Sequence, residues 1–159
     1  MPSWGEFASS HAALAAFGAG CLTRAPAYIA TVRPDGRPRV HPVAPVVTAH
    51  TLFLFMEPTS PKGRDLLAGS GFALHSGVPD NAGTGGEFHV HGTARLIDDS
   101  TLRADASHAA AFDVADRWVL FELLVMRAVC NGYGDVELPE PRSWANAAEP
   151  TGRDRYSGA

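Results

Sequence analysis

The sequence predicts a mainly β (α+β) domain, in which six antiparallel strands form a barrel or sandwich with short flanking helices. Its 159 residues suffice for one domain with a single core. The 16 glycines and 12 prolines make up close to 18% of the chain, against roughly 12% on average, which argues against a long helical bundle. Short apolar stretches of strand length alternate with turn signals along most of the sequence.

A first helix is expected from about residue 4 to 18. Ser3 and Glu6 have the spacing of a capping box, and apolar side chains then recur at helical intervals. Gly18 and Gly20 are expected to end this helix, because glycine favours the position just after a helix.

Two strands joined as a hairpin are expected next. The first covers 27–33, a Pro-Asp-Gly turn at 34–36 reverses the chain, and the second covers 38–47. Pro42 and Pro45 lack a backbone donor, so the second strand is expected to be irregular or bulged, with some backbone groups left free.

The remaining elements are predicted from apolar runs and the turn residues that flank them. They are a strand at 51–56, a short helix at 61–68, strands at 71–76 and 87–97, a helix at 99–112 and a strand at 118–130. The Gly-rich stretch 77–86 is expected to be a flexible loop that could close over a substrate. The tail at 139–159 has no periodicity and is expected to be a loop or an arm.

Charge and cysteine content bear on the class of protein. With 13 basic and 17 acidic residues the net charge is −4, which argues against a nucleic-acid partner. The longest apolar run, from Trp118 to Met126, is short and broken by Glu122, so no membrane partner is expected. We also expect no signal peptide, since the N-terminus lacks a basic region. Cys21 and Cys130 give no disulfide framework, and a cytoplasmic protein is the expectation.

The segment 59–66 contains the strongest local signal for a binding site. Ser60 is a natural N-cap, and Pro61 suits the first helical position. Lys62, the only lysine among the 13 basic residues, and Arg64 then stand in the first turn, where acids are usual. This pattern favours an anion site such as one for phosphate. The alternative is a solvated turn, and this segment alone does not decide between the two.

A second signal lies on the strand that follows the Pro-Asp-Gly turn. Strand alternation places Arg39, His41 and Val43 on one face, and Pro42 leaves backbone groups free. A planar ligand with an anionic tail near Arg39 and Lys62 would fit there. The alternative is an edge strand that Pro and Arg protect from aggregation.

Two further patterns bear on metal binding and on nucleophilic catalysis. His89 and His91 lie on one face of a strand, and Gly83 precedes them as in the start of a cupin motif. A cupin would next need Glu where Arg95 and Leu96 stand, so surface histidines are favoured, no metal ligand is assigned, and metal binding stays a minor hypothesis. No nucleophile elbow and no Rossmann or P-loop glycine pattern occurs.

Taken together, these segments resemble the pyridoxamine 5′-phosphate oxidase-like, FMN-binding split-barrel family. The stretches that carry the resemblance are AYIATVRPDGRPRVHPV (27–43), LFLFMEPTSPKGRDL (52–66), GFALHS (71–76) and EFHVHGTARLIDD (87–99), in the family's order and spacing. The resemblance implies a six-stranded antiparallel split β-barrel in residues 1–138, followed by a C-terminal tail or arm at 139–159. It also implies a homodimer with one flavin in each of two clefts between subunits.

The resemblance further implies a set of cofactor-binding residues. They are His41, Pro42 and Val43 on the second strand, Phe55 and Met56 at the end of the third, Ser60, Pro61 and Lys62 around the phosphate, and Glu87 at the start of the fifth. His41 and Pro61 stand where the family prototype has Arg, so Arg39 or Arg64 is expected to compensate.

The expected function is that of an FMN-dependent oxidoreductase, which passes hydride between the flavin and a small planar substrate. The family's C-terminal Arg-x-His pair has no counterpart after Cys130, so pyridoxamine phosphate is not the expected substrate. A reductase using the deazaflavin coenzyme F-420 and a non-catalytic flavin- or haem-binding protein are the alternatives. No side chain is assigned as catalytic, although His75 and Tyr133 are candidate proton donors.

Overall fold

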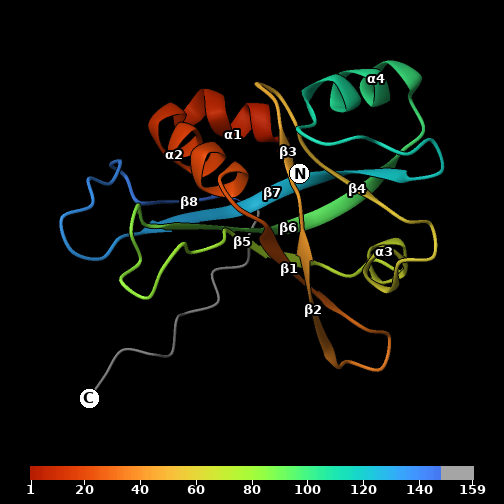
Figure 1. The fold of residues 1–159 in the computed structure, drawn as a ribbon, viewed down its shortest axis with the longest axis horizontal. Coiled ribbons are helices and arrows are strands. Elements are labelled where there is room, and N and C mark those ends of the chain that lie inside the picture. The colour runs from red at the N-terminus through yellow and green to blue at the C-terminus, as the bar shows by residue number, and fades with distance from the viewer. Residues whose placement is uncertain (148–159) are drawn as a thin grey trace.

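The computed structural model describes residues 1–147, and its centre is one curled antiparallel sheet (Figure 1). The strands follow the order β2-β1-β5-β6-β7-β4-β3, and β8 pairs with β7 beyond the end of β4. Their bounds are β1 Ala27–Val32, β2 Pro38–Val43, β3 Val46–Val47, β4 Leu52–Met56, β5 Phe72–His75, β6 Glu87–Ile97, β7 Val119–Asn131 and β8 Ser143–Ala145. The predicted mainly β, antiparallel architecture is therefore confirmed.

The number of strands differs from the predicted six in two places. The single strand expected at 38–47 is divided, because β2 ends at Val43 and β3 begins only at Val46. Pro45 lacks a backbone donor and lies in the link between them, which carries the chain from one edge of the sheet to the other. The stretch expected as a tail from residue 139 contains β8, and its residues 148–159 lie outside the described part of the chain.

Within residues 1–147, four helices flank the sheet, at α1 Trp4–Ser10, α2 Ala12–Thr23, α3 Pro61–Leu67 and α4 Ser100–Ala109. The predicted capping box is present at the start of α1, where Ser3 and Glu6 bond reciprocally. The expectation of one helix ending at Gly18 was wrong. The chain breaks instead at His11, whose backbone is not helical (φ −139°, ψ 60°), and α2 continues through both glycines to Thr23.

Gly18 has a packing role. A Cβ atom at this position would lie 2.5 Å from the ring of Phe88 on β6. The missing side chain thus lets α2 approach the sheet closely, and Figure 1 shows α1 and α2 together over one end of the sheet with α4 over the other. Glycine is needed again at Gly92, where β6 bulges against β7 and a Cβ would meet the Leu124 carbonyl oxygen.

The core lies between the inner face of the sheet and helices α1 and α2. Its largest fully buried side chains are Phe7, Phe88, Phe121, Leu14, Leu22, Ile29, Leu52, Leu54, Leu74 and Leu123, while Phe53 and Leu120 belong to a smaller cluster with Val46 and Ala106 of α4. Each contributes roughly 1.5–3 kcal/mol by leaving water. No helix within residues 1–147 is long and apolar enough to cross a membrane.

Candidate cofactor site

A cavity of about 610 Å³ lies where β2 and β4 end and α3 begins; we call it the β4–α3 cavity. Its walls are formed by Pro42, Val43, Ala44, Phe55, Met56, Glu57, Ser60, Lys62, Phe112, Asp113 and Trp118. Six of the cofactor-binding residues predicted from the sequence line it, namely Pro42, Val43, Phe55, Met56, Ser60 and Lys62. The fold thus brings together the ends of two strands and the start of a helix.

Ser60 occupies the N-cap position of α3, with Pro61 at the first helical position. The turn after β4 is closed by the amide of Ser60, which donates to the Glu57 carbonyl oxygen at 2.9 Å. The Ser60 hydroxyl forms no capping hydrogen bond, although the residue is only 7% exposed, and its Oγ has no partner in the described residues. A buried hydroxyl without a partner costs about 1–3 kcal/mol, which a ligand acceptor or donor would recover.

Lys62 is half-buried in the wall of the cavity and forms no ion pair within residues 1–147. Partial burial lowers the pKa of its ammonium group below the usual range. Removing a cation from water without a counter-charge is unfavourable, so this position favours binding of an anion.

His41 lies on β2 beside this corner. It shares the inner, half-buried face of the strand with Arg39 and Val43, as strand alternation predicted. Its Nε2 is buried and has no hydrogen-bond partner in the described residues. Burial lowers the pKa of His41, and the positive charges of Lys62 and Arg39 lower it further. The imidazole is therefore neutral near pH 7 and leaves one polar atom unsatisfied.

The two arginines expected to compensate do not line the cavity. Arg39 instead donates from Nε to Oδ2 of Asp65 at 2.9 Å, and the Thr31 hydroxyl donates to the same oxygen at 2.7 Å. Asp65 is buried, so this bridge ties α3 to β1 and β2. Arg64 is exposed on α3 and is not among the residues that line the cavity.

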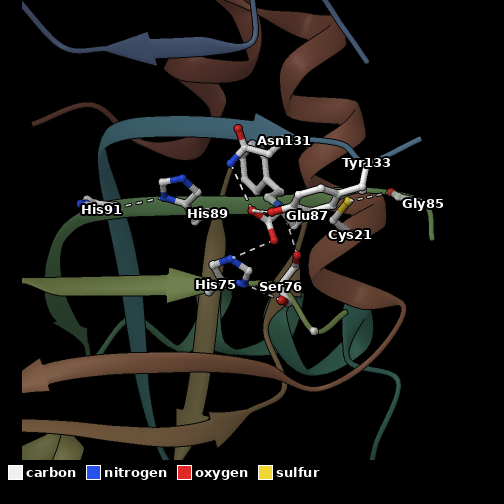
Figure 2. A network of polar contacts seen from close by, with 12 residues as sticks. Cys21, His75, Ser76, Gly85, Glu87, His89, His91, Asn131 and Tyr133 are labelled. Carbon is white, nitrogen blue, oxygen red and sulfur yellow. Dashed lines mark hydrogen bonds and ion pairs between the residues drawn. The ribbon is translucent and has the colours of Figure 1, made fainter. Parts of the chain in front are cut away.

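Glu87 lies in a different part of the chain from the cavity, at the start of β6 (Figure 2). Its Oε1 accepts hydrogen bonds from Asn131 Nδ2 at 3.1 Å and Tyr133 Oη at 3.4 Å, and its Oε2 lies 3.6 Å from His75 Nε2. Both candidate proton donors, His75 and Tyr133, are thus grouped with Glu87. Within one chain these three residues are not brought to the β4–α3 cavity.

Next to this group, Figure 2 shows His89 beside His91. The two rings approach to 3.1 Å between His89 Nδ1 and His91 Nε2, and His89 stacks on His75 with ring centroids 5.8 Å apart. Burial and the two neighbouring histidines lower the pKa of His89. In residues 1–147 no three His, Cys, Asp or Glu side chains are arranged to hold a metal ion.

Five residues of the cavity wall were not predicted from the sequence, namely Ala44, Glu57, Phe112, Asp113 and Trp118. Trp118 donates from Nε1 to Glu57 Oε1 at 2.7 Å, and its ring lies 6.2 Å from that of Phe112. The pairing of β4 with β7 places Met56 opposite Val119 and so brings Glu57 next to Trp118. Only that register could have identified Glu57 and Trp118, because no local motif marks them.

The sequence model of the pyridoxamine 5′-phosphate oxidase family matches residues 18–126. The chain belongs to this family. The match includes β1 to β6 and all six predicted residues that line the β4–α3 cavity. No curated protein matches the sequence significantly.

Solved structures support the split-barrel fold. A heme binding protein from Mycobacterium smegmatis superposes with a TM-score of 0.62 at 18% identity, over 91% of this chain and 59% of that one. HutZ, the heme storage protein from Vibrio cholerae, gives 0.54 at 15% identity over 70% and 89% of the two chains. An F-420 reductase gives 0.53 at 18% identity over 68% and 91%. At these identities the likeness concerns the fold alone.

Proposed function

We propose that the protein is an FMN-dependent oxidoreductase whose flavin binds in the β4–α3 cavity. The observation that carries the proposal is Lys62, a half-buried cation that forms no ion pair within residues 1–147, beside the Ser60 hydroxyl, which has no hydrogen-bond partner there. A phosphate ester matches both, because its oxygens accept hydrogen bonds and carry negative charge. His41 Nε2 is the third unsatisfied group at this corner.

The rest of the cavity suits the ring system of a flavin. Val43, Phe55 and Met56 offer apolar and aromatic surface, and the Trp118 ring adds a second aromatic wall. When bound, the flavin supplies hydride transfer to or from a small planar substrate. The residues of the chain then hold the phosphate, orient the ring and exclude water.

We also propose that two copies of the chain assemble around the flavin. Tyr28, Val32 and Val40 are half or more exposed, and their alternation along β1 and β2 places them all on the outer face of the sheet. Exposed apolar residues gathered on one face favour a protein interface. Glu87 lies away from the cavity of its own chain, so it would reach a flavin only in a second copy.

Lys62→Ala tests the phosphate grip. We expect the affinity for FMN to fall about 10-fold or more, equivalent to ~1.4 kcal/mol, in titrations that follow flavin fluorescence. Arg64→Ala is the matched control, since it removes a cation from the same helix outside the cavity. Riboflavin, which lacks the phosphate, should bind the native protein more weakly than FMN. Equal losses in both variants, or equal binding of FMN and riboflavin, would place the phosphate elsewhere.

Two alternatives share the same observation, because the deazaflavin coenzyme F-420 also carries a phosphate and a flavin can be bound without turnover. Structurally similar proteins include an F-420 reductase and two proteins that bind or store heme. Incubation of purified protein with FMN, F-420 and haem, followed by gel filtration and absorption spectra, identifies which one stays bound. Retention of haem alone would replace the oxidoreductase proposal by a binding function.

A further inference from the structure

A second cavity, of about 370 Å³, adjoins the first. It lies between the end of α2, strand β3 and the end of α4, and we call it the α2–α4 cavity. Its walls are formed by Leu22, Thr23, Ala25, Pro26, Ala44, Pro45, Val46, Val47, Ala109, Ala111 and Phe112. Ala44 and Phe112 line both cavities. The two spaces therefore share one wall, which consists of the link from β2 to β3 and the segment after α4.

Among the described residues, the walls of the α2–α4 cavity carry no charged side chain and no histidine. The hydroxyl of Thr23 is the only polar side-chain group among its lining residues, and it donates to the Ala19 carbonyl oxygen at 2.8 Å. Pro26 and Pro45 contribute no backbone N–H. The β4–α3 cavity differs in this respect, because Glu57, Lys62 and Asp113 line it.

This wall between the cavities is held in place by the folded core. Phe112 packs against the small apolar cluster that includes Val46 and Leu120. The segment after α4 is further fixed by Arg103, whose Nη1 donates to the Trp118 carbonyl oxygen at 2.7 Å and whose Nη2 donates to that of Asp116 at 3.1 Å. The shared wall is therefore fixed by packing and hydrogen bonds within the folded chain.

We propose that the α2–α4 cavity binds a small, uncharged and mainly apolar molecule, which would meet the cofactor at the border of the two cavities beside Ala44 and Phe112. Transfer of an ionised group into such a pocket is strongly unfavourable, whereas apolar surface gains by leaving water. The role of this molecule as the hydride-transfer substrate rests on the proposed function, while the binding site itself does not. The charged end of the cofactor would thus bind in the β4–α3 cavity, and the apolar substrate in the adjoining α2–α4 cavity.

Two naphthalenes of matched size test the selectivity. Naphthalene-2-methanol is neutral at pH 7 and 2-naphthoate is an anion, and the affinity of each is measured by isothermal titration calorimetry with the native protein. We expect the alcohol to bind at least about 10-fold more tightly than the carboxylate. Equal affinities, or tighter binding of the carboxylate, would overturn the proposal.

Ala109→Glu tests the location, because Ala109 is exposed at the end of α4 and lines only the α2–α4 cavity. The variant should bind naphthalene-2-methanol about 10-fold more weakly. Ala104→Glu, exposed on the same helix and lining neither cavity, should leave that affinity unchanged. An affinity that Ala109→Glu does not reduce, or that both variants reduce alike, contradicts the site.

Saturation with FMN separates this proposal from the proposed function. Naphthalene-2-methanol should bind FMN-loaded protein and cofactor-free protein with equal affinity. Competition with FMN would place it in the β4–α3 cavity and overturn the proposal. If FMN itself fails to bind, the proposed function fails, while the comparison of Ala109→Glu with Ala104→Glu still decides the apolar site.

Discussion

The charge of His41 depends on whether an anion binds in the candidate site. Its Nε2 is buried without a partner, and burial together with Lys62 and Arg39 lowers its pKa below the usual 6.5, against a smaller opposite effect of Asp65. These are the charged groups that face it from β2 and from α3. A dianionic phosphate placed beside this ring would reverse the balance of charge and raise its pKa.

Binding of FMN is therefore expected to take up a proton at His41. At pH 7.5 the free phosphate ester is a dianion, with a second pKa of about 6, and the free imidazole is neutral. Because the complex holds a proton that neither free partner carries, affinity should fall as the pH rises above 7. Calorimetry in two buffers of different ionisation enthalpy measures the number of protons taken up on binding of FMN. The native protein should take up about one proton more than the His41→Gln variant. Equal uptake by both would show that the phosphate does not reach His41.

Asp65 is the buried carboxylate that ties α3 to β1 and β2 beside the candidate site. It is 3% exposed and accepts hydrogen bonds from Thr31 and Arg39, so Asp65→Asn leaves a partly buried guanidinium without its counter-charge. We expect the free energy of unfolding in urea to drop by about 2–3 kcal/mol. Asp35→Asn, which affects an exposed pair with Arg37, should have a much smaller effect. Equal effects would mean that the bridge between α3 and the hairpin contributes little.

At the scale of elements, helix α2 shows why two glycines in one helix can have opposite roles. A Cβ at position 18 would meet the Phe88 ring at 2.5 Å, whereas a Cβ at position 20 would have no atom within 4 Å. Gly18→Ala should therefore lower the free energy of unfolding by about 1–3 kcal/mol. Gly20→Ala should raise it by about 0.5–1 kcal/mol, because alanine favours helix and nothing is displaced. Thermal unfolding of both variants checks the signs, and two changes of the same sign contradict the packing account.

The same helix shows what local sequence could and could not predict. The strands at 27–33, 51–56, 71–76, 87–97 and 118–130 were predicted close to their bounds, because their apolar runs and turn residues are local signals. The role of Gly18 depends on Phe88, which is 70 residues away, and the contact of Glu57 with Trp118 depends on the register of β4 with β7. The position of Ser60 and Lys62 at the start of α3 could be predicted, because an N-cap residue, a proline and an unusual cation stand side by side in the sequence. Long-range packing leaves no such mark.

At the scale of the whole molecule, the outer face of the β2-β1-β5-β6 sheet carries exposed apolar side chains. Tyr28, Val32 and Val40 are 50%, 51% and 61% exposed there. The register of β1 with β5 and of β5 with β6 continues this face to His75 and His89. Glu87, which alternates with Phe88 and so shares the face of His89, lies on the same surface. A copy that covers this face would bury the apolar residues and bring Glu87 close to another chain.

Val40→Glu tests whether this face assembles two copies. A carboxylate in the centre of an apolar interface costs several kcal/mol, whereas on a free surface it costs little. In sedimentation velocity the native chain of 16.8 kDa should run as a dimer, and Val40→Glu as a monomer with weakened FMN binding. Leu96→Glu is the matched control, because Leu96 is 40% exposed but pairs with the buried Phe121 and so lies off the outer face. If the native chain sediments as a monomer that still binds FMN, the flavin site is complete within one chain, and the outer face must serve a different partner.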